Sequence, residues 1–220
     1  MTLDCSDYLP TLSAVRALIA PERRETSERH LRAYGAYDGA KFDRMIDHGH
    51  PNEITEDDFR AVSQLKVNVL LEARPWFTGE GHTRVYELLE AIPADRDIWE
   101  IEEGDFDSIY GEDSPAWELW DLISNLQKGA GRAGRWVTAG KLLHGKRPRL
   151  IPIYDDQAVR PALHVTQRTV WEAFWCTLRH SDVRDELTAI QAAVPSTEGL
   201  SLLRVLDIIT WMSVEDPGDL

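Results

Sequence analysis

Apolar residues recur at helical spacing along almost the whole chain, and this periodicity limits the fold to packed helices. Thr55 followed by Asp58 has the pattern of a capping box, and Ser114 precedes a proline at a first helical position. Residues 67–71 could form a strand, but one strand does not make a sheet. We therefore predict an all-α fold, a single globular domain of about eight to ten helices. The helical segments are residues 9–20, 22–32, 55–65, 83–92, 114–123, 137–143, 166–178, 181–190 and 197–212.

The composition is that of a folded protein with a sizeable core, since 43% of residues are apolar and eight are Trp. No run of about 18 apolar residues is present, and the first residues resemble no secretory signal, so no membrane contact is expected. Two cysteines, Cys5 and Cys176, exclude a disulfide framework and a multi-cysteine zinc site, and Cys176 is expected in the core. We expect a cytoplasmic protein with one domain over residues 1–214 and an acidic tail over 215–220.

Charge is unevenly distributed along a chain whose formal net charge is −14. Residues 126–170 hold nine Lys or Arg against Asp155 and Asp156, whereas residues 95–121 hold eleven acids against Arg96. A local excess of positive charge is typical of an anion-binding surface, so nucleic acid, most simply DNA, is the expected partner of residues 126–170. The acidic stretch is either a solvated face or the surface for a protein partner.

The segment 129–155 carries the most chemical information. It is a glycine-rich turn, a buried helix, a basic elbow around Pro148 and a short apolar run that ends at Asp155. Converging backbone N–H groups at a glycine turn before a helix can hold a phosphate, and nearby cations add charge. A solvated basic loop is the alternative interpretation of the elbow. The predicted phosphate-binding residues are Gly131, Arg132, Gly134, Arg135, Lys141, Lys146, Arg147 and Arg149.

Two elements of this segment, Thr138-Ala139-Gly140 and Pro152-Ile153-Tyr154-Asp155, resemble the helix-hairpin-helix DNA glycosylase superfamily. The resemblance implies a helix-hairpin-helix glycosylase-like fold and gives Asp155 the role of catalytic carboxylate. The family's Leu-Pro-Gly-Val-Gly hairpin is altered or longer here, since Gly129-Ala130-Gly131 lies a few residues earlier than the family's pattern. Val137 stands where bifunctional members have a Schiff-base lysine, so monofunctional excision is expected and Lys141 is interpreted as a phosphate contact or a helix-surface lysine.

The chain as a whole resembles an uncharacterised family of actinobacterial proteins, known as a domain of unknown function. The shared elements are Tyr-Asp-Gly-Ala-x-Phe-Asp, here residues 37–43, and a longer element, here residues 136–155. This resemblance implies no activity.

Excision of a base passes through an oxocarbenium-like transition state, which an ionised carboxylate stabilises. Asp155 is the candidate for this role, although it could also be only the N-cap of the next helix. A flipped base needs aromatic side chains on which to stack, and Trp136 and Tyr154 are the candidates by sequence proximity. The alternative for both aromatic residues is core packing.

These observations favour a DNA glycosylase-like protein that excises or recognises a modified or damaged base with Asp155. The first alternative is a non-catalytic helical protein that binds nucleic acid or protein. A small-molecule enzyme with a pocket around Asp38, Asp43 and Asp155 also remains open. The sequence His48-Gly49-His50 fits a polar loop better than a metal site, so no metal or cofactor is expected.

Overall fold

The computed structural model describes residues 3–215, except the side chains of Ala130, Arg132 and Ala133. In that range the regular structure is helical throughout, and residues 67–71 form no strand. The all-α prediction is confirmed, but the chain is divided into more and shorter helices than the periodicity suggested. For example, residues 39–45 form a helix where none was predicted, in addition to the helix over residues 24–34.

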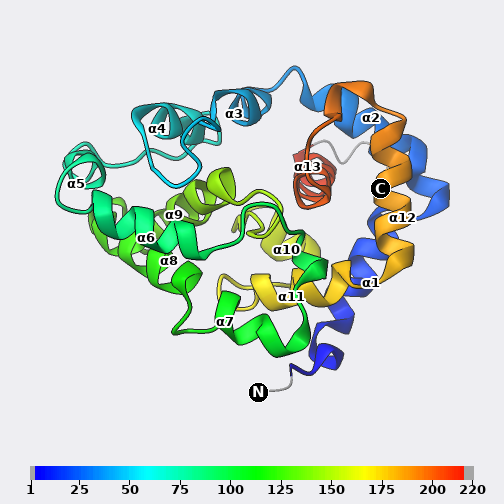
Figure 1. Cartoon of the computed structure of the whole chain (residues 1–220). Helices are drawn as coiled ribbons and strands as arrows, with labels where there is room; N and C mark the ends of the chain where they lie inside the picture. The colour runs from blue at the N-terminus through cyan, green and yellow to red at the C-terminus, as the bar shows by residue number, and fades with distance from the viewer. Residues whose placement is uncertain (1–2, 216–220) are drawn as a thin grey trace.

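The first group of helices comes from the middle of the chain and lies mainly on the left of Figure 1. Helices α8 and α9 form its centre, with α6 packed on α8 and with α4 on α9. The group consists of α3 (Gly39–Met45), α4 (Glu56–Ser63), α5 (Arg74–Thr78), α6 (His82–Ala91), α7 (Phe106–Tyr110), α8 (Pro115–Leu126) and α9 (Arg132–Lys146).

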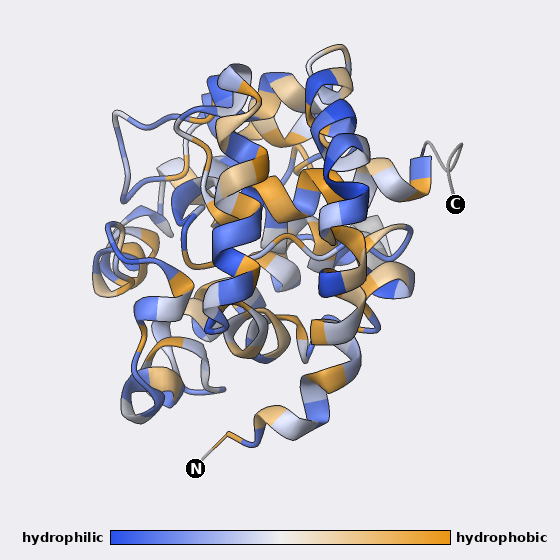
Figure 2. Cartoon of the chain, turned by 90° about the vertical axis from the view of Figure 1, so that its right-hand side faces the viewer, coloured by the Kyte–Doolittle hydropathy of each residue, from blue (hydrophilic) through white to orange (hydrophobic). Residues whose placement is uncertain are grey.

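The second group combines both ends of the chain and lies mainly on the right of Figure 1. In this group α13 packs against α2, α10 and α12, so it is the central helix. Hydrophilic and hydrophobic residues occupy different faces of the outer helices, as the view in Figure 2 shows. The group consists of α1 (Leu9–Leu18), α2 (Arg24–Tyr34), α10 (Val159–Leu163), α11 (Val170–Leu178), α12 (Ser181–Ala192) and α13 (Leu202–Glu215).

Local sequence signals explain several helix ends. The Thr55 capping box is present, and the Ser114 side chain accepts a hydrogen bond from the Trp117 N–H, so both predictions are confirmed. The helix predicted over residues 83–92 is present as α6, which begins one residue earlier, at His82. Helix α9 begins five residues before the predicted start at 137, directly after Gly131, whose φ of 76° favours glycine.

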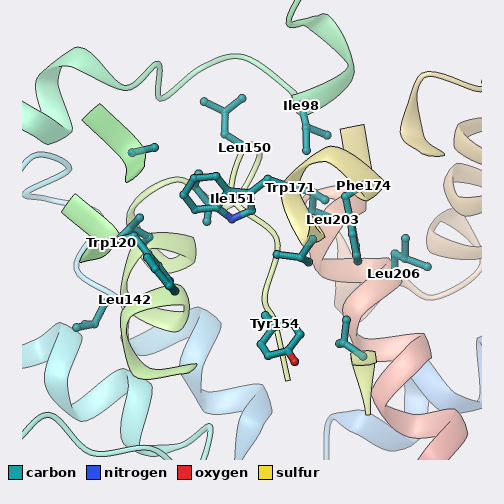
Figure 3. Close-up of a cluster of buried hydrophobic side chains, with 14 of the residues drawn as sticks. Ile98, Trp120, Leu142, Leu150, Ile151, Tyr154, Trp171, Phe174, Leu203 and Leu206 are labelled. Carbon is teal, nitrogen blue, oxygen red and sulfur yellow. The ribbon is translucent and has the colours of Figure 1, made fainter. Parts of the chain in front are cut away.

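An extended run over residues 150–154 passes between the two groups of helices. Figure 3 shows Ile151 and Tyr154 between Trp120 and Leu142 on one side and Leu203 and Leu206 on the other. All six side chains are buried. Because the run is anchored on both sides, it places the residue that follows it, Asp155, where the two groups meet.

The two cysteines form a disulfide, which the sequence analysis did not expect. Cys5 and Cys176 are 171 positions apart, yet their Cα atoms lie 5.6 Å apart. The prediction that Cys176 lies in the core is confirmed. The short 3-10 helix η1 (Cys5–Tyr8) packs against α11, and this contact brings the two sulfurs together.

The structure bears only in part on the predicted acidic tail over residues 215–220 and on the expected absence of a membrane span. Glu215 ends α13 and does not begin a tail, and residues 216–220 lie outside the described residues. Over residues 3–215, no helix is both long enough and apolar enough to span a bilayer.

Candidate functional site

A cavity of about 680 Å³ lies where the two groups of helices meet. Exposed residues such as Tyr37, Asp38 and Lys66 form part of its wall, so it opens to solvent. The wall comes from the turn between α2 and α3, the loop after α4, one face of α9, the segment 153–157 and one face of α13. This volume is within the usual range for small-molecule and cofactor sites.

Asp155 lines this cavity from the end of the buried extended run. Its Oδ1 atom accepts hydrogen bonds from the backbone N–H groups of Gln157 at 2.8 Å and Ala158 at 3.1 Å. Its side chain is 21% exposed. The carboxylate therefore holds the turn before α10 and at the same time lines the cavity, but the N-cap of α10 is Ala158 and not Asp155, which the capping interpretation had expected.

Lys141 approaches Asp155 from α9. Its Nζ lies 3.5 Å from Asp155 Oδ2 and donates a hydrogen bond to the Leu65 carbonyl at 2.9 Å. Burial lowers the pKa of Lys141, and the nearby Asp155 carboxylate opposes this shift. The interpretation of Lys141 as a helix-surface residue is wrong. It lies four residues after Val137, which also lines the cavity, so α9 directs both side chains to the same side.

Behind this pair lies a buried ion cluster that the sequence analysis missed. Arg204 donates through Nε to Asp43 Oδ1 at 2.8 Å and through Nη2 to the Tyr34 hydroxyl at 2.7 Å, and its Nη1 bonds Asp207. Burial raises the pKa of Asp207 to about 6, while Arg204 and Lys141 act in the opposite direction. The signal was present in the sequence, since Arg204 and Asp207 are charged residues in a mostly apolar helix.

The aromatic wall of the cavity comes from Trp211 and Tyr37. Their ring centroids lie 5.3 Å apart in an edge-to-face arrangement, and Tyr34 makes a second edge contact with Trp211 at 6.2 Å. Trp211 is on the same face of α13 as Arg204 and Asp207. One helix face thus supplies both the ion cluster and a flat apolar surface.

The aromatic residues predicted from sequence proximity lie elsewhere. Trp136 is half-buried and stacks on Trp120 at 6.1 Å, and Tyr154 is buried with its hydroxyl donating to Asp156 Oδ1 at 2.6 Å. Neither residue lines the cavity. Tyr154 packs in the core, as the alternative expected, and a stacking role for the half-buried Trp136 stays a prediction.

Most of the basic elbow is structural. Lys146 forms an ion pair of 2.6 Å with Asp58, and both side chains are almost fully buried. Arg147 is also buried and donates to backbone carbonyls, including those of Ile92 and Pro51, each at 2.8 Å. These two predicted phosphate contacts are wrong, because the cations hold the loops around residues 47–58 and 89–92 to the end of α9.

The other predicted phosphate-binding residues are divided between surface and internal contacts. Arg149 pairs with Asp97, with Nε 3.0 Å from Oδ1, while half of its side chain remains exposed. Arg135 lies over the Trp136 ring at 5.2 Å. Gly131 is exposed at the turn, Gly134 is half-buried within α9, and the side chain of Arg132 lies outside the described residues. Phosphate binding at this turn stays a prediction.

Two acids of residues 95–121 and one histidine of the His48–His50 segment form ion pairs with other side chains. Asp97 pairs with Arg149, and Glu118 pairs with Arg84 at 2.6 Å. His50 contacts Asp47 at 2.7 Å through Nδ1, and this contact raises the pKa of His50. Among the described side chains, no group of three or more His, Cys, Asp and Glu residues could hold a metal ion.

Comparison with known proteins gives a family and no activity. No curated protein and no solved structure matches the chain. A family model, described as a family of unknown function, matches residues 24–214, which include every residue of the cavity wall except Glu215. The chain therefore belongs to the family of unknown function DUF6308.

Proposed function

We propose that this protein is a DNA glycosylase-like enzyme that binds a modified or damaged base in the cavity and hydrolyses its N-glycosidic bond. The observation that carries the proposal is the position of Asp155, a partly exposed carboxylate at the wall of an open cavity beside a buried lysine. The order of α8, a short turn, α9 and an extended run that leads to this carboxylate agrees with the resemblance to helix-hairpin-helix glycosylases.

In this reaction the bond between the sugar C1′ and the base nitrogen breaks, and its electron pair leaves with the base. The oxygen of a water molecule adds to C1′, and the proton that the water loses balances the charge on the base. The Asp155 carboxylate stabilises the positive charge that develops on the sugar. Two backbone N–H groups donate to this carboxylate and Lys141 Nζ lies 3.5 Å from it, so its position is fixed before the substrate binds.

The aromatic wall gives the base a place to stack. Trp211 and Tyr37 lie on the side of the cavity formed by α13 and the turn before α3, across from α9. Stacking on an aromatic side chain contributes about 1–3 kcal/mol per base. A base bound there would be held by Trp211 while its sugar faces Asp155.

One observation favours a second substrate class. Lys146 and Arg147, which were expected to contact a DNA backbone, are buried, so the basic surface is smaller than the sequence suggested. A free nucleoside or nucleotide needs no long basic surface. Hydrolysis of such a small N-glycoside at the same cavity is therefore the alternative.

The test compares two tryptophans. We expect Trp211→Leu to weaken the binding of a base-containing ligand by about tenfold or more, because the stacking surface is lost. Trp136→Leu is the matched control, since Trp136 is also partly buried in a helix but does not line the cavity. Binding is measured by titration with oligonucleotides that carry single damaged bases and with the corresponding free nucleosides, and free base is quantified by mass spectrometry.

Circular dichroism establishes that both variants are folded. Equal losses in the two variants would contradict a base site at Trp211. If wild-type protein releases base from none of these substrates, the enzymatic proposal is wrong. A preference for oligonucleotides over nucleosides would separate the first substrate class from the second.

A further inference from the structure

Lys66 has an unusual backbone conformation at the mouth of the cavity. Its φ of 59° lies in the left-handed region, where among the described residues only His164 and two glycines accompany it. Such a conformation is uncommon for a residue with a long side chain, and it concentrates at ligand-binding positions. The loop is held by the Lys66 N–H, which donates to Ser63 O at 3.1 Å, and by the Leu70 N–H, which donates to the Gln127 side chain at 2.9 Å.

The side chain of Lys66 reaches over the aromatic wall. Its Nζ lies 6.0 Å from the ring centroid of Trp211, and the residue is exposed and lines the cavity. The other two cations of the wall, Lys141 and Arg204, are buried and paired with carboxylates. Within the described part of the chain, Lys66 makes no ion pair within 4.0 Å, so its charge is available to a ligand.

The cavity wall also holds four carboxylates, and three of them have a cationic partner other than Lys66: Asp38, Asp155 and Asp207. Asp38 is the acid whose pKa Lys66 helps to lower, but Asp38 is paired with Lys41 at 2.7 Å, which is the larger cause of that shift. Glu215 lines the cavity at the end of α13. Because three of these carboxylates have other partners, Lys66 can bind an anionic group of a ligand.

The loop that bears Lys66 is also connected to the Asp155 carboxylate through Lys141. The carbonyl of its neighbour Leu65 accepts the hydrogen bond from Lys141 Nζ, and the same Nζ lies 3.5 Å from Asp155 Oδ2. Lys141 Nζ therefore contacts both the loop that bears Lys66 and the carboxylate of Asp155. A ligand with a ring on Trp211 and a sugar at Asp155 would bring its phosphate close to Lys66.

We propose that Lys66 and Trp211 form a subsite for a phosphate ester on the substrate, so that the cavity accepts a nucleotide unit in preference to an unphosphorylated nucleoside. This inference rests on the proposed function and adds the substrate class. The phosphate is that of a DNA strand or that of a free nucleotide, since the recognised chemistry is the same.

The experiment is a titration of the full chain with inorganic phosphate at constant ionic strength, followed by the indole N–H signal of Trp211. The signal is assigned from its absence in Trp211→Leu. We expect phosphate to shift this signal, and we expect Lys66→Asn to reduce the affinity by about three- to tenfold. Asparagine tolerates a left-handed backbone, so this variant removes the charge without a new strain. Arg60→Asn is the matched control, because Arg60 is an exposed cation that pairs with Asp57 and does not line the cavity, and this variant should bind phosphate as wild type does.

Two outcomes would overturn the subsite. One is a wild-type Trp211 signal that phosphate does not shift, and the other is the same affinity in wild type and Lys66→Asn. Repeating the titration with deoxynucleosides, their 5′-monophosphates and short single-stranded DNA identifies the source of the phosphate. Lys66→Asn should lower the affinity for the monophosphates and for the DNA and leave the affinity for the nucleosides unchanged. The phosphorylated ligand that wild type binds more tightly identifies the source of the phosphate.

The two proposals can fail separately. Phosphate binding that depends on Lys66, together with no release of base from any substrate, would contradict the proposed hydrolysis and leave the subsite intact. Release of base from nucleosides and nucleotides at equal rates in wild type and in Lys66→Asn would contradict the subsite and leave the hydrolysis intact.

Discussion

Replacing Asp155 by asparagine is expected to lower the rate of base release by about a hundredfold to a thousandfold. The substitution removes the negative charge that stabilises the sugar in the transition state. It keeps an oxygen that can accept the N–H groups of Gln157 and Ala158, so the turn into α10 should be preserved. The rate is measured under single-turnover conditions, and ligand binding is measured separately by the titration of Trp211.

Asp156→Asn provides the control for this prediction. Asp156 is the next residue along the chain and is also partly buried, but its carboxylate contacts Tyr154 and Arg160 and does not line the cavity. Its substitution should leave the rate close to that of wild type. Wild-type activity in Asp155→Asn, with normal binding, would show that the carboxylate only caps the turn.

Replacing Arg204 by methionine is expected to lower the free energy of unfolding by about 3–5 kcal/mol. The variant leaves the carboxylates of Asp43 and Asp207 in a buried site without their cation, and their desolvation is then not compensated. For a chain of this length, such a loss lowers the melting temperature by roughly 10 °C, which calorimetry measures.

Arg16→Met is the control for this loss, because Arg16 pairs with Asp182 on the surface and should melt close to wild type. A triple variant that also carries Asp43→Asn and Asp207→Asn should recover part of the stability, since no uncompensated charge remains. If Arg204→Met alone melts like wild type, the cluster does not hold α3 against α13.

The helical fold could be predicted because its signals are local. The capping box at Thr55 and the Ser114-Pro115 pair are short patterns whose meaning depends little on the rest of the chain. The expected helix count was too low, since helices as short as α3 and α5, with seven and five residues, contain too few positions to show a helical period. Asp155 was also found from its local context, at the end of an apolar run.

The walls of the cavity could not be predicted in the same way, because they depend on contacts between distant segments. Trp211 and Lys66 reach the same site from positions far apart in the sequence, and no spacing rule connects them. Lys146 and Arg147 resembled a surface loop because they precede a proline. Their partners, such as Asp58, are about ninety residues away, so their burial could not be inferred from neighbours. Of the three acids that the sequence grouped in one pocket, Asp38 and Asp155 line the cavity, whereas Asp43 does not line it and pairs with Arg204.

The bond between Cys5 and Cys176 closes most of the chain into a covalent ring, with α12 and α13 outside it. A protease that cuts a loop inside this ring breaks the backbone, but the disulfide still joins the two fragments. In denaturing gel electrophoresis the fragments therefore migrate as one species until a reductant is added. The ring begins before residue 24, where the match to the family starts, so the segment ahead of that match is fastened to the core by more than packing. Nicked protein can therefore keep the two sides of the cavity in one molecule.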